Sequence, residues 1–265
     1  MKTKHILNVV DAFADKPFAG NPAAVCVLDA PADETWMKLV AREMNLAETA
    51  FLYPIADGWS LRWFTPSVEV ELCGHATLAS AFTLWETGAL RADETARFST
   101  LSGWLTCRRE HAWIEMDFPY QVCMTCESPD GLAEALGCEP LSCGLNSMDY
   151  LVEVANERTL RSLKPDFNAI ANLPVRGVIA TCRSESLEFD FVSRFFAPAV
   201  SVNEDPVTGS AHCALGPYWQ TKLGKSDFTA YQASERGGLV RLSVRGDRVR
   251  LRGQAVMMSR VELLH

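Results

Sequence analysis

The chain has 265 residues, of which 48% are hydrophobic and 22% are charged, and its formal net charge is -8 at pH 7. This length predicts one large or two modest globular domains that bury a substantial core. The negative charge argues against nucleic acid or an anionic membrane surface as the main partner.

The first 22 residues, MKTKHILNVVDAFADKPFAGNP, lack the uninterrupted apolar core and the small-residue cleavage site of a signal peptide. No stretch approaches the roughly 20 apolar residues that a membrane-spanning helix needs. We therefore expect a cytoplasmic protein. Its nine cysteines are then expected to be mostly reduced thiols rather than a disulfide framework.

Periodicity and turn residues predict a series of helices and strands along the chain. In chain order they are an amphipathic helix over 33–44, a strand over 60–66, a buried helix over 75–88, an amphipathic helix over 128–137, strands over 150–155, 177–182 and 190–198, a second buried helix over 210–224, and a strand over 239–244. The segment 117–131 is the predicted joint between two domains, 1–122 and 123–265. We leave open that the C-terminal strand returns to the first domain.

An internal repeat supports this division into two halves. The stretch RWFTPSVEVELCGHA begins at Arg62, and RFFAPAVSVNEDPVTGSA begins at Arg194. Five residues recur at an offset of 132 (194 − 62), and after an insertion three more recur at 135 (209 − 74). Each copy predicts a strand, a glycine turn and a helix that is small or apolar nearly all round, which is typical of a buried helix. Pro217 is predicted to kink or interrupt the second helix.

The starts of these two helices are candidate anion sites. The first turn of a helix has free N–H groups and a partial positive charge. Two such ends that face each other across the cleft between the halves would suit a carboxylate. His75 and Ser210 occupy equivalent places at the two starts, and Asp205 lies on the loop before the second. Simple helix capping by serine and aspartate is the alternative interpretation.

Glu48 is a further candidate, because it is the only charged residue between Glu43 and Asp57. Its neighbours are small or apolar, and such a setting adapts a carboxylate to general acid/base chemistry near neutral pH. The alternative is an exposed glutamate at the edge of a strand.

A cluster of cysteines follows the predicted joint. Cys123, Cys126, Cys138 and Cys143 have the spacing C-x2-C-x11-C-x4-C. Structural zinc sites use paired cysteines, but the second spacing is unusual for one. We therefore interpret these four residues as incidental thiols.

Four motifs resemble those of the PhzF-like isomerase family, which is related in fold to diaminopimelate epimerase. They are FAGNPAAVCVL (18–28), EMNLAETAFL (43–52), RWFTPSVEVELCGHATLASA (62–81) and EDPVTGSAHCAL (204–215). The resemblance covers essentially the whole chain in the same order. It implies an α/β fold of two pseudo-symmetric domains, each a curved mixed sheet wrapped around a central helix. It also implies a homodimer that uses no cofactor and no metal.

The same resemblance implies an isomerase that relocates a proton on a small carboxylate, which is expected to be cyclic. It assigns the acid/base role to Glu48 and supporting catalytic roles to His75, Asp205 and Ser210. The residues that it implies for substrate binding are Gly74, Gly209, Asn21 and Cys73.

Two other functions remain open at this point. Epimerases of this fold use two thiols as opposed bases, and Cys73 lies where the first would be. Its counterpart at the offset of 132 is Asp205, so two-thiol epimerisation is not expected, although an epimerase or racemase that uses Glu48 and Cys73 is an alternative. The second alternative is a non-catalytic protein that binds a small carboxylate or serves as an interaction partner.

Overall fold

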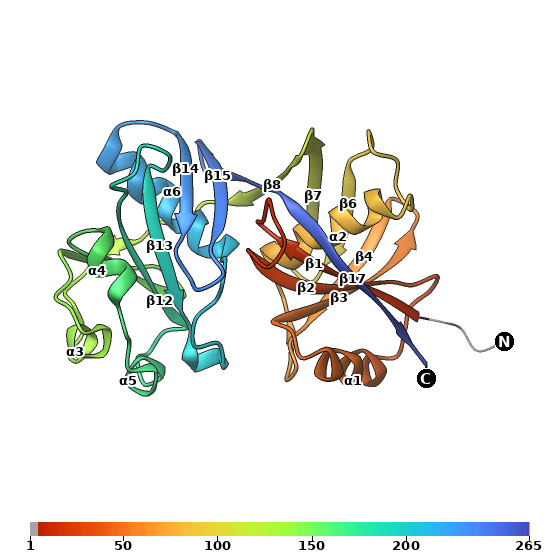
Figure 1. Ribbon diagram of the computed structural model, residues 1–265, viewed down its shortest axis with the longest axis horizontal. Coiled ribbons are helices and arrows are strands. Elements are labelled where there is room, and N and C mark those ends of the chain that lie inside the picture. The colour runs from red at the N-terminus through yellow and green to blue at the C-terminus, as the bar shows by residue number, and fades with distance from the viewer. Residues whose placement is uncertain (1–4, 265) are drawn as a thin grey trace. The chain divides into compact units, whose positions relative to one another are not determined.

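The computed structural model describes residues 5–264, which divide into two compact units (Figure 1). The second unit is Phe118–Leu251, and the first comprises the residues before and after it. The C-terminal segment therefore belongs to the first unit. The boundary expected at 122/123 lies just inside the second unit.

The sheet of the first unit mixes parallel and antiparallel pairs. Its strands are β1 (His5–Ala12), β2 (Asn21–Val27), β3 (Glu48–Ile55), β4 (Gly58–Phe64), β5 (Glu69–Val70), β6 (Ala96–Thr100), β7 (Gly103–Glu110), β8 (Trp113–Pro119) and β17 (Ala255–Leu263). The pairs β2–β3 and β4–β6 are parallel. The pairs β1–β2, β3–β4 and β6–β7 are antiparallel, and β17 pairs antiparallel with β1.

The sheet of the second unit repeats this succession of pairs. Its strands are β9 (Met124–Thr125), β10 (Ser142–Leu145), β11 (Asp149–Glu153), β12 (Gly177–Arg183), β13 (Phe191–Phe196), β14 (Asp227–Gln232), β15 (Gly238–Arg245) and β16 (Arg248–Gly253). Here β11–β12 and β13–β14 are parallel, whereas β10–β11, β12–β13 and β14–β15 are antiparallel. The strands β1, β2, β3, β4, β6 and β7 thus correspond to β10 to β15, as the sequence repeat predicts.

Each sheet curves around one central helix, α2 (Gly74–Glu86) in the first unit and α6 (Gly209–Leu223) in the second. Every residue of α2 from His75 to Ala81 is buried, and so is every residue of α6 from Ala211 to Gly216. Both helices are therefore covered on all sides, as their composition predicts. Among the helices of residues 5–264, none is long and apolar enough to cross a membrane.

The prediction that Pro217 interrupts the second helix is wrong, because α6 continues through it. Proline has no N–H to donate to the carbonyl four residues earlier, which is that of Cys213. That carbonyl instead accepts a hydrogen bond of 3.0 Å from the backbone N–H of Gln121. A segment from outside the helix thus replaces the bond that the proline removes.

Smaller helices cover the outer faces of the sheets. They are α1 (Glu34–Met44), α3 (Leu132–Leu136), α4 (Glu157–Ser162), α5 (Phe167–Ala171) and the single 3-10 turn η1 (Pro198–Val200). In the first unit, α1 and α2 lie on opposite faces of the sheet (Figure 1). The predicted helix over 128–137 is shorter than expected, since α3 has only five residues.

The repeat also preserves one half-buried ion pair in each unit. Arg194 donates to both carboxylate oxygens of Glu204, at 2.7 and 2.8 Å, and also to the carbonyls of Leu160 and Leu163. Its repeat partner Arg62 donates in the same way to both carboxylate oxygens of Glu69, each at 2.6 Å. Such charge-assisted bonds are stronger than neutral ones, and they fix the loop that leads to each central helix.

We expect Arg194→Lys to lower the free energy of unfolding by about 1.5–3 kcal/mol, because one ammonium group cannot replace the guanidinium fork. The matched substitution is Arg91→Lys, since Arg91 pairs with Asp93 on the surface, where both side chains are more than two-thirds exposed (74% and 69%). That change should leave the urea midpoint unaltered. Urea unfolding of both variants checks the expectation, and equal effects would contradict it.

Candidate active site

An ion pair lies at the start of the central helix of the first unit. Glu48 is the first residue of β3, and its Oε2 lies 2.9 Å from Nε2 of His75, the second residue of α2. The His75 side chain is 6% exposed and that of Glu48 is 17% exposed. Glu48 is therefore neither isolated among apolar residues nor an exposed edge glutamate, and its carboxylate has a fixed partner.

The other nitrogen of the imidazole faces two more of the predicted residues. Nδ1 of His75 lies 3.1 Å from Nδ2 of Asn21 and 3.6 Å from Sγ of Cys73. Asn21 reaches this place because the chain turns sharply at Gly20, whose φ is +66°. A Cβ at Gly20 would lie 2.1 Å from the carbonyl oxygen of Ala12, so this turn requires glycine.

Burial and neighbouring charge have opposite effects on the pKa of His75. Burial alone would lower the pKa of His75, but the charge of Glu48 and the contacts with Glu48 and Cys73 outweigh it and raise the pKa well above the ordinary value. For the thiol of Cys73, burial and the charge of Glu48 both raise the pKa. The arrangement therefore favours a protonated imidazole and a neutral thiol beside the carboxylate.

Glu48, Cys73 and His75 are also the residues that come closest to a metal site. Their ligand atoms lie within 4.8 Å of one another. The carboxylate lies at one ring nitrogen of His75, however, and the thiol lies at the other. An ion bound to either nitrogen would therefore need the third ligand to move.

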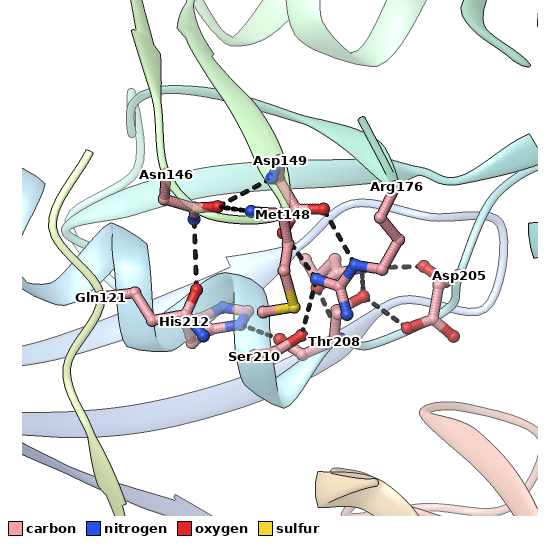
Figure 2. Close-up of polar contacts among 10 residues, drawn as sticks. Gln121, Asn146, Met148, Asp149, Arg176, Asp205, Thr208, Ser210 and His212 are labelled. Atoms are coloured by element: carbon pink, nitrogen blue, oxygen red, sulfur yellow. Dashed lines mark hydrogen bonds and ion pairs between the residues drawn. The ribbon is translucent and has the colours of Figure 1, made fainter. Parts of the chain in front are cut away.

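The start of the central helix of the second unit is built from different side chains. Thr208 is its N-cap residue and makes no side-chain cap hydrogen bond. Its hydroxyl instead donates to Oδ2 of Asp205 at 2.5 Å, as Figure 2 shows. Gln232 supports the turn, because its amide donates to the Asp205 carbonyl and its Oε1 accepts from the Thr208 N–H. The capping interpretation therefore does not describe the N-cap residue of α6.

An arginine that the sequence analysis did not select lies beside Ser210 (Figure 2). Arg176 donates to both carboxylate oxygens of Asp149, at 2.9 and 2.5 Å, and its Nη2 also donates to Oγ of Ser210 at 3.1 Å. Asp149 is fully buried, whereas the Arg176 side chain is 28% exposed. Its Nη1 makes no hydrogen bond to any other described residue, so two donors point away from the pairing with Asp149.

A signal for Arg176 is present in the sequence. Asp149 opens the strand β11, Arg176 directly precedes β12, and these two strands pair in parallel. Because parallel neighbours begin at the same edge of a sheet, an acid and a base at the two starts are brought together. The signal becomes legible only when the parallel pairing is known.

The same helix carries a second buried histidine. Nδ1 of His212 contacts the carbonyl oxygen of Thr208 at 2.8 Å, and the side chain is fully buried. Burial lowers its pKa from the ordinary 6.5 to about 4, against the opposing effect of that hydrogen bond. In the first unit the equivalent residue is Thr77, whose hydroxyl donates to the carbonyl of Cys73. This histidine thus has the structural role of a buried threonine.

Equivalent positions in the two units carry different chemistry. The N-cap residues of the central helices, Cys73 and Thr208, correspond to each other, so the counterpart of the thiol is Thr208 and not Asp205 as expected. Thr49 of β3 pairs with Phe64, and Val178 of β12 pairs with its repeat partner Phe196. The residues directly before Thr49 and Val178, which are Glu48 and Gly177, therefore also correspond to each other.

Those earlier residues are Glu48 and Gly177. A Cβ at Gly177 would lie 2.5 Å from the carbonyl oxygen of Phe196, so no side chain fits there. The repeat thus places the carboxylate in one unit only.

The structure groups the predicted residues by unit. In the first it brings together Glu48, His75, Asn21 and Cys73. In the second, Asp205 and Ser210 both belong to the start of α6. Each central helix begins at a predicted glycine, Gly74 or Gly209.

Comparisons with known proteins agree with this architecture. Residues 10–260 match the phenazine biosynthesis-like protein family, PhzC-PhzF. An uncharacterized isomerase of Halalkalibacterium halodurans is 55% identical over 97% of both chains. The crystal structure of a PhzF-family phenazine biosynthesis protein from Enterococcus faecalis has a TM-score of 0.95 at 39% identity and covers 99% of this chain and 100% of its own.

A more distant structure shares the fold alone. It is a hydroxyproline epimerase from Agrobacterium vitis, with a TM-score of 0.65 at 10% identity, and the match covers 99% of this chain and 93% of that one.

The pKa values of the two buried histidines should be shifted in opposite directions, upwards for His75 and downwards for His212. Nitrogen-15 NMR of labelled histidine is expected to show a neutral His212 at pH 6 and a protonated His75 at pH 7. Because the folded-state pKa of His212 lies below its ordinary value, its contribution to stability is complete above pH 6.5 and is lost as the pH falls towards 4, by about 3 kcal/mol in total.

Glu48→Gln is the matched control for this titration. Removing the carboxylate charge should lower the pKa of His75 and leave that of His212 unchanged. Titration of His212 near pH 6.5 would contradict the assignment.

Proposed function

The chain belongs to the phenazine biosynthesis-like family, and we propose that it is an isomerase that relocates a proton on a small cyclic carboxylate without a cofactor. The observation that carries this proposal is the buried contact between Glu48 and His75 at the start of α2. A positioned carboxylate within hydrogen-bond distance of an imidazole is a common general acid/base arrangement.

In the proposed reaction, Glu48 removes a proton from a carbon atom next to an unsaturated system. The electron pair of the broken C–H bond shifts the double bond, and the proton is returned to a different carbon. His75 stabilises the carboxylate whenever Glu48 is ionised, and Asn21 lies 3.1 Å from Nδ1 on the opposite side of the ring. The same carboxyl group thus serves as base and then as acid.

The asymmetry of the repeat supports a single base. Inversion of a carbon centre needs a base on each of its two faces, whereas relocation along one face needs only one. The counterpart of Glu48 is Gly177, and the counterpart of Cys73 is Thr208, which has no thiol. The second unit therefore repeats neither of these two groups.

The start of α6 is suited to hold the carboxylate of the substrate. Arg176 is fixed by Asp149 and has a free Nη1 edge, and the hydroxyl of Ser210 lies 3.1 Å from its Nη2. A carboxylate here can accept one hydrogen bond from Nη1 and a second from the Ser210 hydroxyl. The first N–H groups of α6 add favourable donors and a partial positive charge.

A two-base epimerase is the second candidate, because Sγ of Cys73 lies 3.6 Å from the imidazole of His75. Burial raises the pKa of this thiol, however, so little of it is the thiolate that could act as a base at neutral pH. Cys73→Ala distinguishes the candidates. An isomerase should retain turnover in this variant, whereas a two-base epimerase should lose it as completely as in Glu48→Gln.

Glu48→Gln should lose at least about 100-fold of turnover, since an amide cannot accept and return the proton. The assay is incorporation of solvent deuterium into a panel of small cyclic amino and hydroxy carboxylic acids, followed by NMR. The matched control is Glu43→Gln on the exposed face of α1, which should keep the activity of the unsubstituted enzyme. Undiminished exchange in Glu48→Gln would refute the assignment.

Substitutions at the start of α6 should act on substrate affinity instead. Arg176→Lys is expected to raise KM by about 10-fold or more with little change in kcat, because the charged Nη1 donor that Asp149 holds in place is lost. Ser210→Ala should raise KM by a smaller factor. The control is Arg161→Lys, which changes an exposed guanidinium that pairs with the half-buried Glu157 of α4. A large fall in kcat at constant KM would contradict a binding role.

A further inference from the structure

Two of the four clustered cysteines face each other across a strand pair. In the antiparallel pairing of β9 with β10, Thr125 lies opposite Gly144, so the next pair in register is Cys126 and Cys143. The backbone N–H of Cys126 donates to the carbonyl of Cys143 at 3.1 Å. The two sulfur atoms lie 3.6 Å apart.

The other two cysteines do not complete a metal site with this pair. Within residues 5–264, the group of three ligands close enough to hold an ion is Glu48, Cys73 and His75. The thiol of Cys123 is hydrogen-bonded to Asn146, and Cys138 follows the C-cap glycine of α3. The structure therefore presents a pair of thiols rather than a four-cysteine zinc site.

The backbone geometry at this pair is compatible with a disulfide. Directly opposed residues in a hydrogen-bonded antiparallel pair have Cα atoms about 5.5 Å apart. Disulfides span Cα separations of about 4.4–6.8 Å. The sulfur atoms need to approach by only about 1.5 Å to reach the bond length of about 2.05 Å, so small side-chain rotations suffice.

The two thiols differ in how a reagent reaches them. Cys126 is half-buried, whereas Cys143 is 7% exposed. Burial also raises the pKa of Cys143 to about 12, so little of it is thiolate at neutral pH. An oxidant therefore meets Cys126 first.

We propose that Cys126 and Cys143 form a reversible disulfide when the protein meets a low-molecular-weight disulfide such as oxidised glutathione. The thiolate of Cys126 attacks one sulfur of the reagent, which forms a mixed disulfide and releases one glutathione thiolate. Cys143 then loses its proton to solvent and attacks the sulfur of Cys126, and the second glutathione thiolate leaves. The two protein thiols are oxidised by two electrons, and the reagent is reduced to two thiols.

The bond would join the edge strand β9 to the body of the second unit. It closes a ring that contains α3, and it lies on the strand that leads to Asn146. The side chain of Asn146 accepts hydrogen bonds from the N–H groups of Met148 and Asp149, as Figure 2 shows. Oxidation would therefore constrain the segment next to the acid that holds Arg176.

The test treats the native, fully reduced protein with oxidised glutathione and maps its peptides without reduction. We expect a linked pair of peptides that contain Cys126 and Cys143, a mass lower by two hydrogen atoms, and full reversal by dithiothreitol. The thermal midpoint of the oxidised protein should rise by several degrees, because a closed loop restricts the unfolded chain.

Single variants separate the roles of the two thiols. Cys143→Ser should trap a stable glutathione adduct on Cys126, whereas Cys126→Ser should leave Cys143 unmodified. The matched controls Cys123→Ser and Cys138→Ser should still form the bond. The proposal is overturned if the native protein does not react, if it stops at the glutathione adduct, or if its main product links Cys123 to Cys126.

Discussion

Burying a helix on every side is the constraint on which both units depend. A helix at the centre of a sheet cannot hydrate its first turn freely, and neither central helix obtains a side-chain cap from its N-cap residue. By contrast, the outer helix α1 is capped by Asp33. The loops before α2 and α6 must therefore hold these helix starts in place by other means. They do so with a half-buried arginine–glutamate pair in each unit, and this leaves the helix start for other polar side chains.

The two units answer the same constraint with different residues. The first surrounds the start of its helix with a carboxylate, an imidazole and a thiol, whereas the second uses hydroxyl groups and an arginine fixed by a buried acid. One framework thus carries different polar groups at its two helix starts. Charge at Glu48 favours His75 as a cation in spite of its burial, whereas burial keeps His212 neutral, so the electrostatics of the two central helices differ although their backbones correspond.

The division into two similar units could be predicted from the sequence, because residues that recur at a constant offset indicate a repeated backbone geometry. The arginines at 62 and 194 and the glycines at 74 and 209 predicted the two strand-turn-helix units and both helix starts. What the sequence could not provide were contacts between segments far apart in the chain. The role of Arg176 depends on a parallel strand pair, and the continuity of α6 through Pro217 depends on Gln121, almost a hundred residues earlier. The offset that matched Cys73 to Asp205 failed because the insertion lies between the strand and the helix.

The pairing of β1 with β17 has a consequence for how the protein folds during its synthesis. The first unit is assembled from both ends of the chain, since β1 pairs along its whole length with β17. During synthesis, β17 is made after every other strand of the first unit. Until β17 is made and pairs, β1 keeps an open edge, and such an edge readily pairs with other chains. The first unit, whose β1 is made first, is therefore completed only when its final strand β17 has been added.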